Sequence, residues 1–125
     1  MRTFVIDSIS AVTLEMRGQV VVTGSHGGRS AAHLALAHPP AFVIFNDAGV
    51  GLDNAGIAGL EILQLNGVAA CTVSYASARI GDATSTLETG VISHTNSLAH
   101  DGNVRVDQLC AEAISFFTKS PFDRG

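Results

Sequence analysis

Three short, continuously apolar segments constrain the fold of this chain more than any other feature. They are residues 19–23 (QVVVT), 41–45 (AFVIF) and 68–74 (VAACTVS). Apolar runs without polar alternation are typical of strands buried on both faces of a sheet. Helical patterns at 29–37 and 53–65 separate the three runs, with Asp53 as the expected N-cap of the second helix. Strands that alternate with helices in this way predict right-handed crossovers and a parallel sheet.

The remaining segments are less regular. A further strand is expected within residues 3–12, a long loop over 75–85, and helices over 85–100 and 106–118. The chain has 125 residues, which suits a single domain spanning residues 1–125. We therefore expect a small three-layer α/β domain, Rossmann-like or flavodoxin-like, with a mainly parallel sheet of about three to five strands.

Composition narrows the classes of partner. Only 14% of the residues are charged, against about 25% in a typical soluble domain, which predicts a homo-oligomer that hides part of its surface. The net charge is −4 and no basic cluster is present, so we expect no nucleic-acid partner. No uncharged apolar run reaches the length of a membrane span, and Asp7 interrupts the segment where a signal peptide would be apolar. These features predict a cytoplasmic protein with no membrane partner, in which Cys71 and Cys110 are buried thiols.

Polar, glycine-containing segments follow each of the three predicted strands. They read TGSHGGRS from residue 23, NDAGVGLDNAG from residue 46 and SYASARIGDATS from residue 74. In an open parallel sheet, ligands bind at the carboxyl ends of the strands. The three segments are therefore expected to meet at one edge of the sheet and to form the functional site.

The first segment offers groups that suit an anion. Gly27 and Gly28 allow backbone amides to approach a ligand closely, and Arg29 adds a fixed positive charge. Ser25 supplies a hydroxyl and His26 a titratable imidazole. The alternative is a tight turn that needs its glycines for packing alone.

The second and third segments add carboxylates and a guanidinium. Asn46 and Asp47 directly follow a strand, where Asp47 is a candidate general base and Asn46 a candidate ligand of the substrate. An Asx turn is the alternative for both residues. In the third segment, Arg79 and Asp82 are either a structural ion pair or, with Ser77, ligands of the substrate.

Glu88 and His94 lie in the expected helix over 85–100. Glu88 is a candidate substrate-binding residue, and His94 a candidate catalytic one. Six positions on a regular helix correspond to a rotation of about 240°, so the two side chains face one site only if Gly90 breaks the helix. The order Ser25, Asp47, His94 matches that of α/β-hydrolases, but Thr23 stands where the nucleophile elbow has its first glycine.

These residues predict a small-molecule enzyme acting on a polar, anionic substrate. In this hypothesis Ser25 and the amides of Gly27 and Gly28 hold an oxyanion, while His26 or Asp47 moves a proton. The expected chemistry is amide or ester hydrolysis, or a lyase reaction, without a metal or another cofactor, because no ligand spacing for a metal is present. The alternative hypothesis is a non-catalytic sensor or subunit that binds a phosphorylated or carboxylated metabolite.

Overall fold

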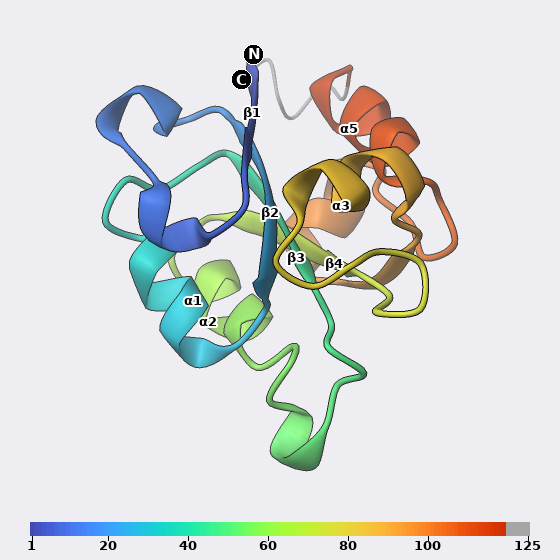
Figure 1. Ribbon diagram of the computed structural model, residues 1–125. Helices are drawn as coiled ribbons and strands as arrows, with labels where there is room; N and C mark the ends of the chain where they lie inside the picture. Colours follow the sequence, from blue (N-terminus) through green and yellow to red (C-terminus); the bar gives the residue numbers. More distant parts are fainter. Residues whose placement is uncertain (120–125) are drawn as a thin grey trace.

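Five strands form one sheet in the order β1-β2-β3-β4-β5 in the computed structural model, which describes residues 1–119 (Figure 1). The strands are β1 (Thr3–Ile6), β2 (Val20–His26), β3 (Phe42–Asn46), β4 (Ala69–Val73) and β5 (Ile92–Thr95). The first four are parallel and β5 is antiparallel to β4. The expected α/β class and mainly parallel sheet are confirmed. Residues 120–125 of the expected single domain lie outside the described part of the chain.

One face of the sheet is covered by the segments that connect the parallel strands. These are the short 3-10 helices η1 (Ile9–Ala11) and η2 (Leu14–Met16) and the helices α1 (Arg29–Ala35) and α2 (Gly59–Leu65). Each right-handed crossover moves to the next strand in the same direction, which places all of them on one face. Figure 1 shows α1 and α2 side by side there. The core beneath them includes Val21, Val43, Phe45, Ala70 and Leu63.

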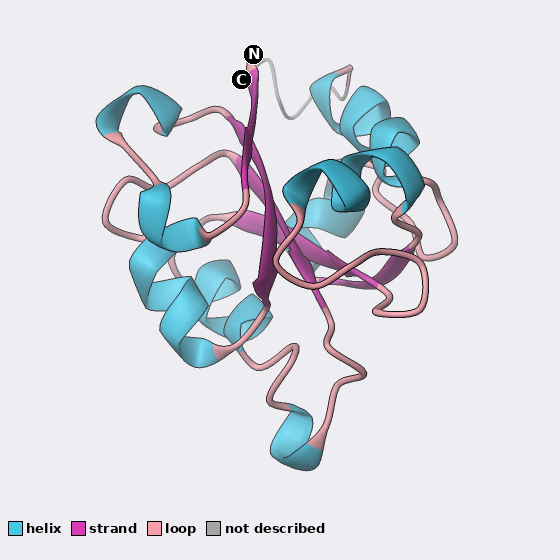
Figure 2. Cartoon of the chain, in the orientation of Figure 1, coloured by secondary structure: helices cyan, strands magenta, loops and turns pink. Residues whose placement is uncertain are grey.

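The opposite face is covered by helices from the C-terminal third of the chain. They are α3 (Ala83–Thr89), α4 (Ser97–Asp101) and α5 (Cys110–Thr118). Figure 2 shows the three layers, with the strands between the two groups of helices. The rings of Phe42 and Phe117 stack with their centroids 4.6 Å apart, which joins β3 to α5. Val22, Ile44 and Cys71 belong to the same core.

The expected helix over 85–100 is wrong. The chain forms α3, then the edge strand β5, then α4. Gly90 lies at the break, where a Cβ atom would come 2.3 Å from the Thr86 carbonyl oxygen and 2.7 Å from a methyl group of Val73. This backbone is extended and turns toward β4, whose exposed hydrogen-bonding edge captures residues 92–95.

Two other helices begin later than expected. α2 begins at Gly59 and not at Asp53, because Asp53 and Asn54 have left-handed φ values of 56° and 58° in the 3-10 helix η3 (Leu52–Asn54). Asp53 is therefore not the N-cap of α2. α5 begins at Cys110 and not at residue 106, because the backbone of Asp107 and Gln108 pairs with Ile92.

The strand order has a consequence for the position of a ligand site. A crevice opens at the carboxyl edge of an open α/β sheet where the strand order reverses, and the parallel strands β1 to β4 run consecutively without a reversal. Figure 1 shows the β3–α2 loop projecting from the carboxyl edge of these strands. The order of β1 to β4 therefore predicts no such crevice, and the change of strand direction in the sheet lies between β4 and the antiparallel strand β5.

Candidate functional site

Asp47 is a buried carboxylate fixed at the end of β3. Its Oδ1 atom accepts hydrogen bonds from the backbone amides of Gly49, at 2.8 Å, and Tyr75, at 3.0 Å. The first bond is the expected Asx turn, and the second ties the β3–α2 loop to the loop after β4. The residue is only 4% exposed. Both hydrogen bonds use the same oxygen, Oδ1, so the second carboxylate oxygen, Oδ2, remains available for another contact.

His94 lies beside that second oxygen. Its Nδ1 atom is 3.9 Å from Asp47 Oδ2, and its side chain is 38% exposed. Asp47 and His94 were both expected to be catalytic, and the structure brings them together from β3 and β5. The separation of 3.9 Å is longer than a hydrogen bond, so Asp47 acts on His94 here as a nearby negative charge, which is the charge that stabilises an imidazolium in acid–base catalysis.

A β-bulge in β5 aligns two further hydroxyl groups with the imidazole. Thr72 of β4 pairs with His94, but the next pair is Val73 with Ile92, so Ser93 is the extra residue. Thr72 Oγ1 lies 2.8 Å from Ser93 Oγ and 3.3 Å from His94 Nδ1, and Ser93 Oγ lies 3.2 Å from the same nitrogen. Without the bulge, neighbouring side chains on β5 would point to opposite faces of the sheet.

These contacts favour one of the two neutral tautomers of His94. Three oxygen atoms surround Nδ1, and one of them belongs to a carboxylate, which can only accept a hydrogen bond. A lone pair on Nδ1 would face that negative charge, whereas an N–H group there is attracted to it. We therefore assign the proton of neutral His94 to Nδ1, which leaves a lone pair on Nε2.

His94 also lines an open cleft between α2 and β5, of about 440 Å³, which we call the His94 cleft. Its other lining residues are Ile57, Leu60, Glu61, Gln64, Thr95, Asn96 and Ser97. Asn96 has a structural role there. Its Oδ1 atom accepts from the amides of Ala70 and Ala99, and its Nδ2 group donates to two carbonyl groups.

The β2–α1 turn holds the residues expected to bind an oxyanion, but its amides are engaged within the protein. The amide of Gly27 donates to the Asn46 carbonyl at 3.0 Å, and that of Gly28 donates to the His26 carbonyl at 2.9 Å. Neither amide is directed at a ligand in this conformation. Ser25 Oγ accepts a hydrogen bond from the amide of Ile9 at 2.9 Å, which fixes the start of η1.

Close backbone packing explains the glycines of this turn. A Cβ atom on Gly27 would lie 2.8 Å from the Gly56 carbonyl oxygen, and one on Gly28 would lie 3.0 Å from that of Ala55. From the other side, a Cβ atom on Gly59 would lie 2.3 Å from the Gly28 carbonyl oxygen. The glycines therefore let the β2–α1 turn and the start of α2 touch through their backbones, as in the packing alternative.

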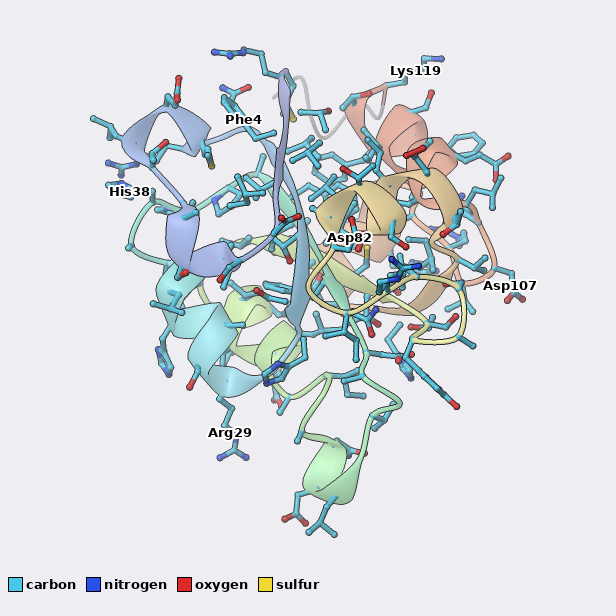
Figure 3. All side chains as sticks on the ribbon, in the orientation of Figure 1. Phe4, Arg29, His38, Asp82, Asp107 and Lys119 are labelled. Atoms are coloured by element: carbon cyan, nitrogen blue, oxygen red, sulfur yellow. The ribbon has the colours of Figure 1, made fainter. Side chains whose placement is uncertain are left out.

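His26 and Arg29 lie apart from the Asp47–His94 pair, in a second hollow of about 590 Å³. Gly28, Ser30, Leu52, Asp53, Ala55 and Ala58 complete its lining. His26 is exposed, and Figure 3 shows the Arg29 side chain extending outward from the start of α1. The structure thus divides the expected single site into two hollows.

The other expected ligands of the substrate are placed as follows. Asn46 is buried and donates to the Ala78 carbonyl, while Ser77 Oγ accepts from the amide of Val91. Asp82 caps α3 by accepting from the amide of Ser85, at the position labelled in Figure 3. Arg79 is exposed, and within residues 1–119 it forms no ion pair with Asp82.

Glu88 and His94 lie in different layers of the molecule. Glu88 is exposed on α3, which packs on β2 and α5, whereas the His94 cleft lies on the face covered by α2. The structure therefore does not bring Glu88 to the His94 cleft, and the break in the expected helix does not unite the two residues.

Three residues of the site were missed by the sequence interpretation. Thr72 carried a weak signal, since it is one of two hydroxyl-bearing residues, with Ser74, in the otherwise apolar run VAACTVS. Ser93 adjoins His94, but its contact depends on a bulge that no local pattern indicates. Glu61 had no signal beyond its place on the polar side of a helix, because the strand opposite it was not predicted.

No family model, curated protein or solved structure matches the chain. Within residues 1–119, no helix is long and apolar enough to cross a membrane. Over the same residues, His, Cys, Asp and Glu side chains form no group of three that could hold a metal ion.

Proposed function

We propose that this protein is a small-molecule hydrolase in which His94, oriented by Asp47, acts as the general base in the His94 cleft. One observation carries the proposal. A nearly buried carboxylate lies 3.9 Å from Nδ1 of a half-exposed histidine on the wall of a cleft. The chemistry needs only protein groups, in line with the metal-independent ester or amide hydrolysis expected from the sequence.

The proposed reaction begins with proton transfer from water to Nε2 of His94. As the proton leaves, the water oxygen forms a bond to the carbonyl carbon of an ester or amide. The bond from that carbon to the alcohol or amine then breaks, and the imidazolium returns the proton to the leaving group. The Asp47 carboxylate stabilises the positive charge that His94 carries between the two transfers.

The experiment is a hydrolysis assay with p-nitrophenyl esters and p-nitroanilides of small acids. His94→Gln and Asp47→Asn are each expected to lower kcat/KM by about 100-fold, the usual contribution of a positioned acid–base group. Asn at position 47 retains the Oδ1 acceptor of the Asx turn, so the fold should survive. His33→Gln, at an exposed position on α1, is the control and should retain full activity. Equal activity of His94→Gln and the unaltered protein would contradict the proposal.

Binding of an anionic metabolite without chemistry is the second candidate function. It is favoured by the hollow that His26 and Arg29 share, since both side chains can carry a positive charge. Titration with inorganic phosphate, followed by the amide resonances of residues 26–30, tests it. Arg29→Gln should abolish any response, and the absence of a response in the unaltered protein would contradict this candidate.

A further inference from the structure

The His94 cleft is lined by acidic and neutral groups. Glu61 is exposed on its α2 side, and the Asp47 carboxylate lies directly behind His94. No Lys or Arg residue lines the cleft among the described residues. With neutral His94, the nearest ionised side chains therefore carry negative charge, which repels an anion and attracts a cation.

Two of the other polar side chains that line the cleft, Gln64 and Asn96, are held by hydrogen bonds within the protein. Gln64 Oε1 accepts a hydrogen bond from the amide of Leu98 at 2.9 Å. Asn96 uses both its oxygen and its amide group within the protein. Among residues 1–119, the Glu61 carboxylate has no ion-pair partner. Glu61 is thus the charged group of the cleft that remains to recognise a ligand.

Two apolar side chains add to the binding surface. Leu60 and Ile57 line the cleft beside Glu61. A cleft of about 440 Å³ accommodates a small molecule of the size of a substituted aromatic ring. A matching ligand has a compact apolar body and one end that carries N–H donors.

We propose that Glu61 is the specificity-determining residue of the His94 cleft and that it selects substrates with an ammonium, amidinium or amide N–H group. The word substrate here rests on the proposed hydrolase function, whereas the binding preference does not. A carboxylate accepts charge-assisted hydrogen bonds from such groups, and an amidinium can engage both of its oxygens. This preference differs from the anionic substrate expected from the loop residues, and Arg79, one of the residues expected to bind that substrate, does not line this cleft.

Three probes of one shape and different charge test the proposal. Benzamidine is cationic, benzamide neutral and benzoate anionic at neutral pH, and each is titrated while the His94 and Glu61 resonances are followed by NMR. The unaltered protein should bind benzamidine most tightly and benzoate most weakly. Because Glu61 is exposed, Glu61→Gln should weaken benzamidine by only about three- to fivefold, and benzamide less. Glu61→Lys should reverse the order of benzamidine and benzoate.

Glu15→Gln is the matched control, because it removes the same charge at an exposed position on η2. It should leave all three affinities unchanged. The proposal is overturned if benzoate binds as tightly as benzamidine, if Glu61→Gln has no effect, or if no probe binds at millimolar concentration. These titrations measure binding and no turnover. A preference for the cationic probe can therefore be found even if His94→Gln leaves hydrolysis intact, and loss of hydrolysis in His94→Gln can be found without such a preference. Failure of one proposal is thus distinguished from failure of the other.

Discussion

Thr72 and His94 face each other across β4 and β5, with Thr72 Oγ1 3.3 Å from His94 Nδ1. Thr72 is fully buried, whereas His94 is half-exposed. The pair therefore joins the rigid centre of the sheet to the wall of the His94 cleft. These contacts hold Nδ1 of His94, whereas Nε2 forms no hydrogen bond among the described residues.

Asn96 is expected to be the most important polar residue for stability. It is 8% exposed and connects β4, α2 and α4 through four hydrogen bonds to backbone groups. Asn96→Ala leaves these groups without their partner and should lower the free energy of unfolding by about 3 kcal/mol or more, since each unsatisfied buried group costs about 1–3 kcal/mol. Urea denaturation measures the change.

Asn66→Ala provides the comparison for Asn96→Ala. Asn66 is exposed, and its side chain donates a single hydrogen bond, to the Ile62 carbonyl. Its replacement should cost less than about 1 kcal/mol. Equal losses in the two variants would show that Asn96 does not have the connecting role assigned to it.

Gly59→Ala sets helix propensity against backbone packing. Alanine within a helix is favoured over glycine by about 1 kcal/mol. The added Cβ atom would, however, lie 2.3 Å from the Gly28 carbonyl oxygen and 3.0 Å from that of Gly27. Overpacking costs about 1–3 kcal/mol, and here the obstacle is backbone, so we expect a net destabilisation. Thermal unfolding of this variant should show a lower Tm than that of the unaltered protein.

Thr84→Ala is the control for helix propensity alone. Thr84 is exposed on α3, where alanine should raise stability slightly. If Gly59→Ala also raised the Tm, the glycines of the β2–α1 turn would not be explained by close packing, and the anion-binding interpretation of that turn would regain support.

The two buried thiols should make the protein less stable at alkaline pH. Burial raises the pKa of Cys110 from its ordinary value of 9.0 to about 12 and raises the pKa of Cys71 well above 9.0, to which the charge of Cys110 adds. Both thiols stay protonated in the folded state while they ionise in the unfolded chain. Their stabilising contribution is therefore complete below pH 9 and is lost as the pH rises toward 12. Each thiol should lower the free energy of unfolding by about 1.4 kcal/mol per pH unit in this window.

Cys110→Ala isolates the contribution of one thiol to this pH dependence. Between pH 9.5 and about pH 11, its slope should be smaller than that of the unaltered protein by one proton. Identical slopes would mean that Cys110 ionises equally in the folded and unfolded states, which its burial in the core opposes.

Local patterns were sufficient for the parallel part of the fold. The apolar runs around Val21, Val43 and Ala70 form β2, β3 and β4. Strands buried on both faces are continuously apolar, so the sequence pattern alone identifies them. The segment from 85 to 100 failed for the opposite reason. Its spacing of apolar residues fits a helix, but β5 forms because the edge of β4 is available, and a hydrogen-bonding edge is a property of the assembled sheet.

The sequence predicted several residues of the candidate site but not how they are arranged. Asp47 and His94 were both named, and the order Ser25, Asp47, His94 grouped them, but no local pattern indicated the strand β5 and the bulge at Ser93 on which their proximity depends. The glycine-rich β2–α1 turn was predicted to bind a ligand because close backbone packing and anion binding both require glycine, so the sequence does not distinguish the two roles. The homo-oligomer and the anionic ligand stay predictions.

The assignment of the His94 proton tests the central claim most directly. Long-range ¹H–¹⁵N correlation spectra distinguish the two neutral tautomers of each histidine. We expect that neutral His94 carries its proton on Nδ1, beside Asp47 and Thr72, and that Asp47→Asn weakens this preference. A proton on Nε2 in the unaltered protein would contradict it, because His94 would then have no lone pair toward the cleft with which to accept a proton.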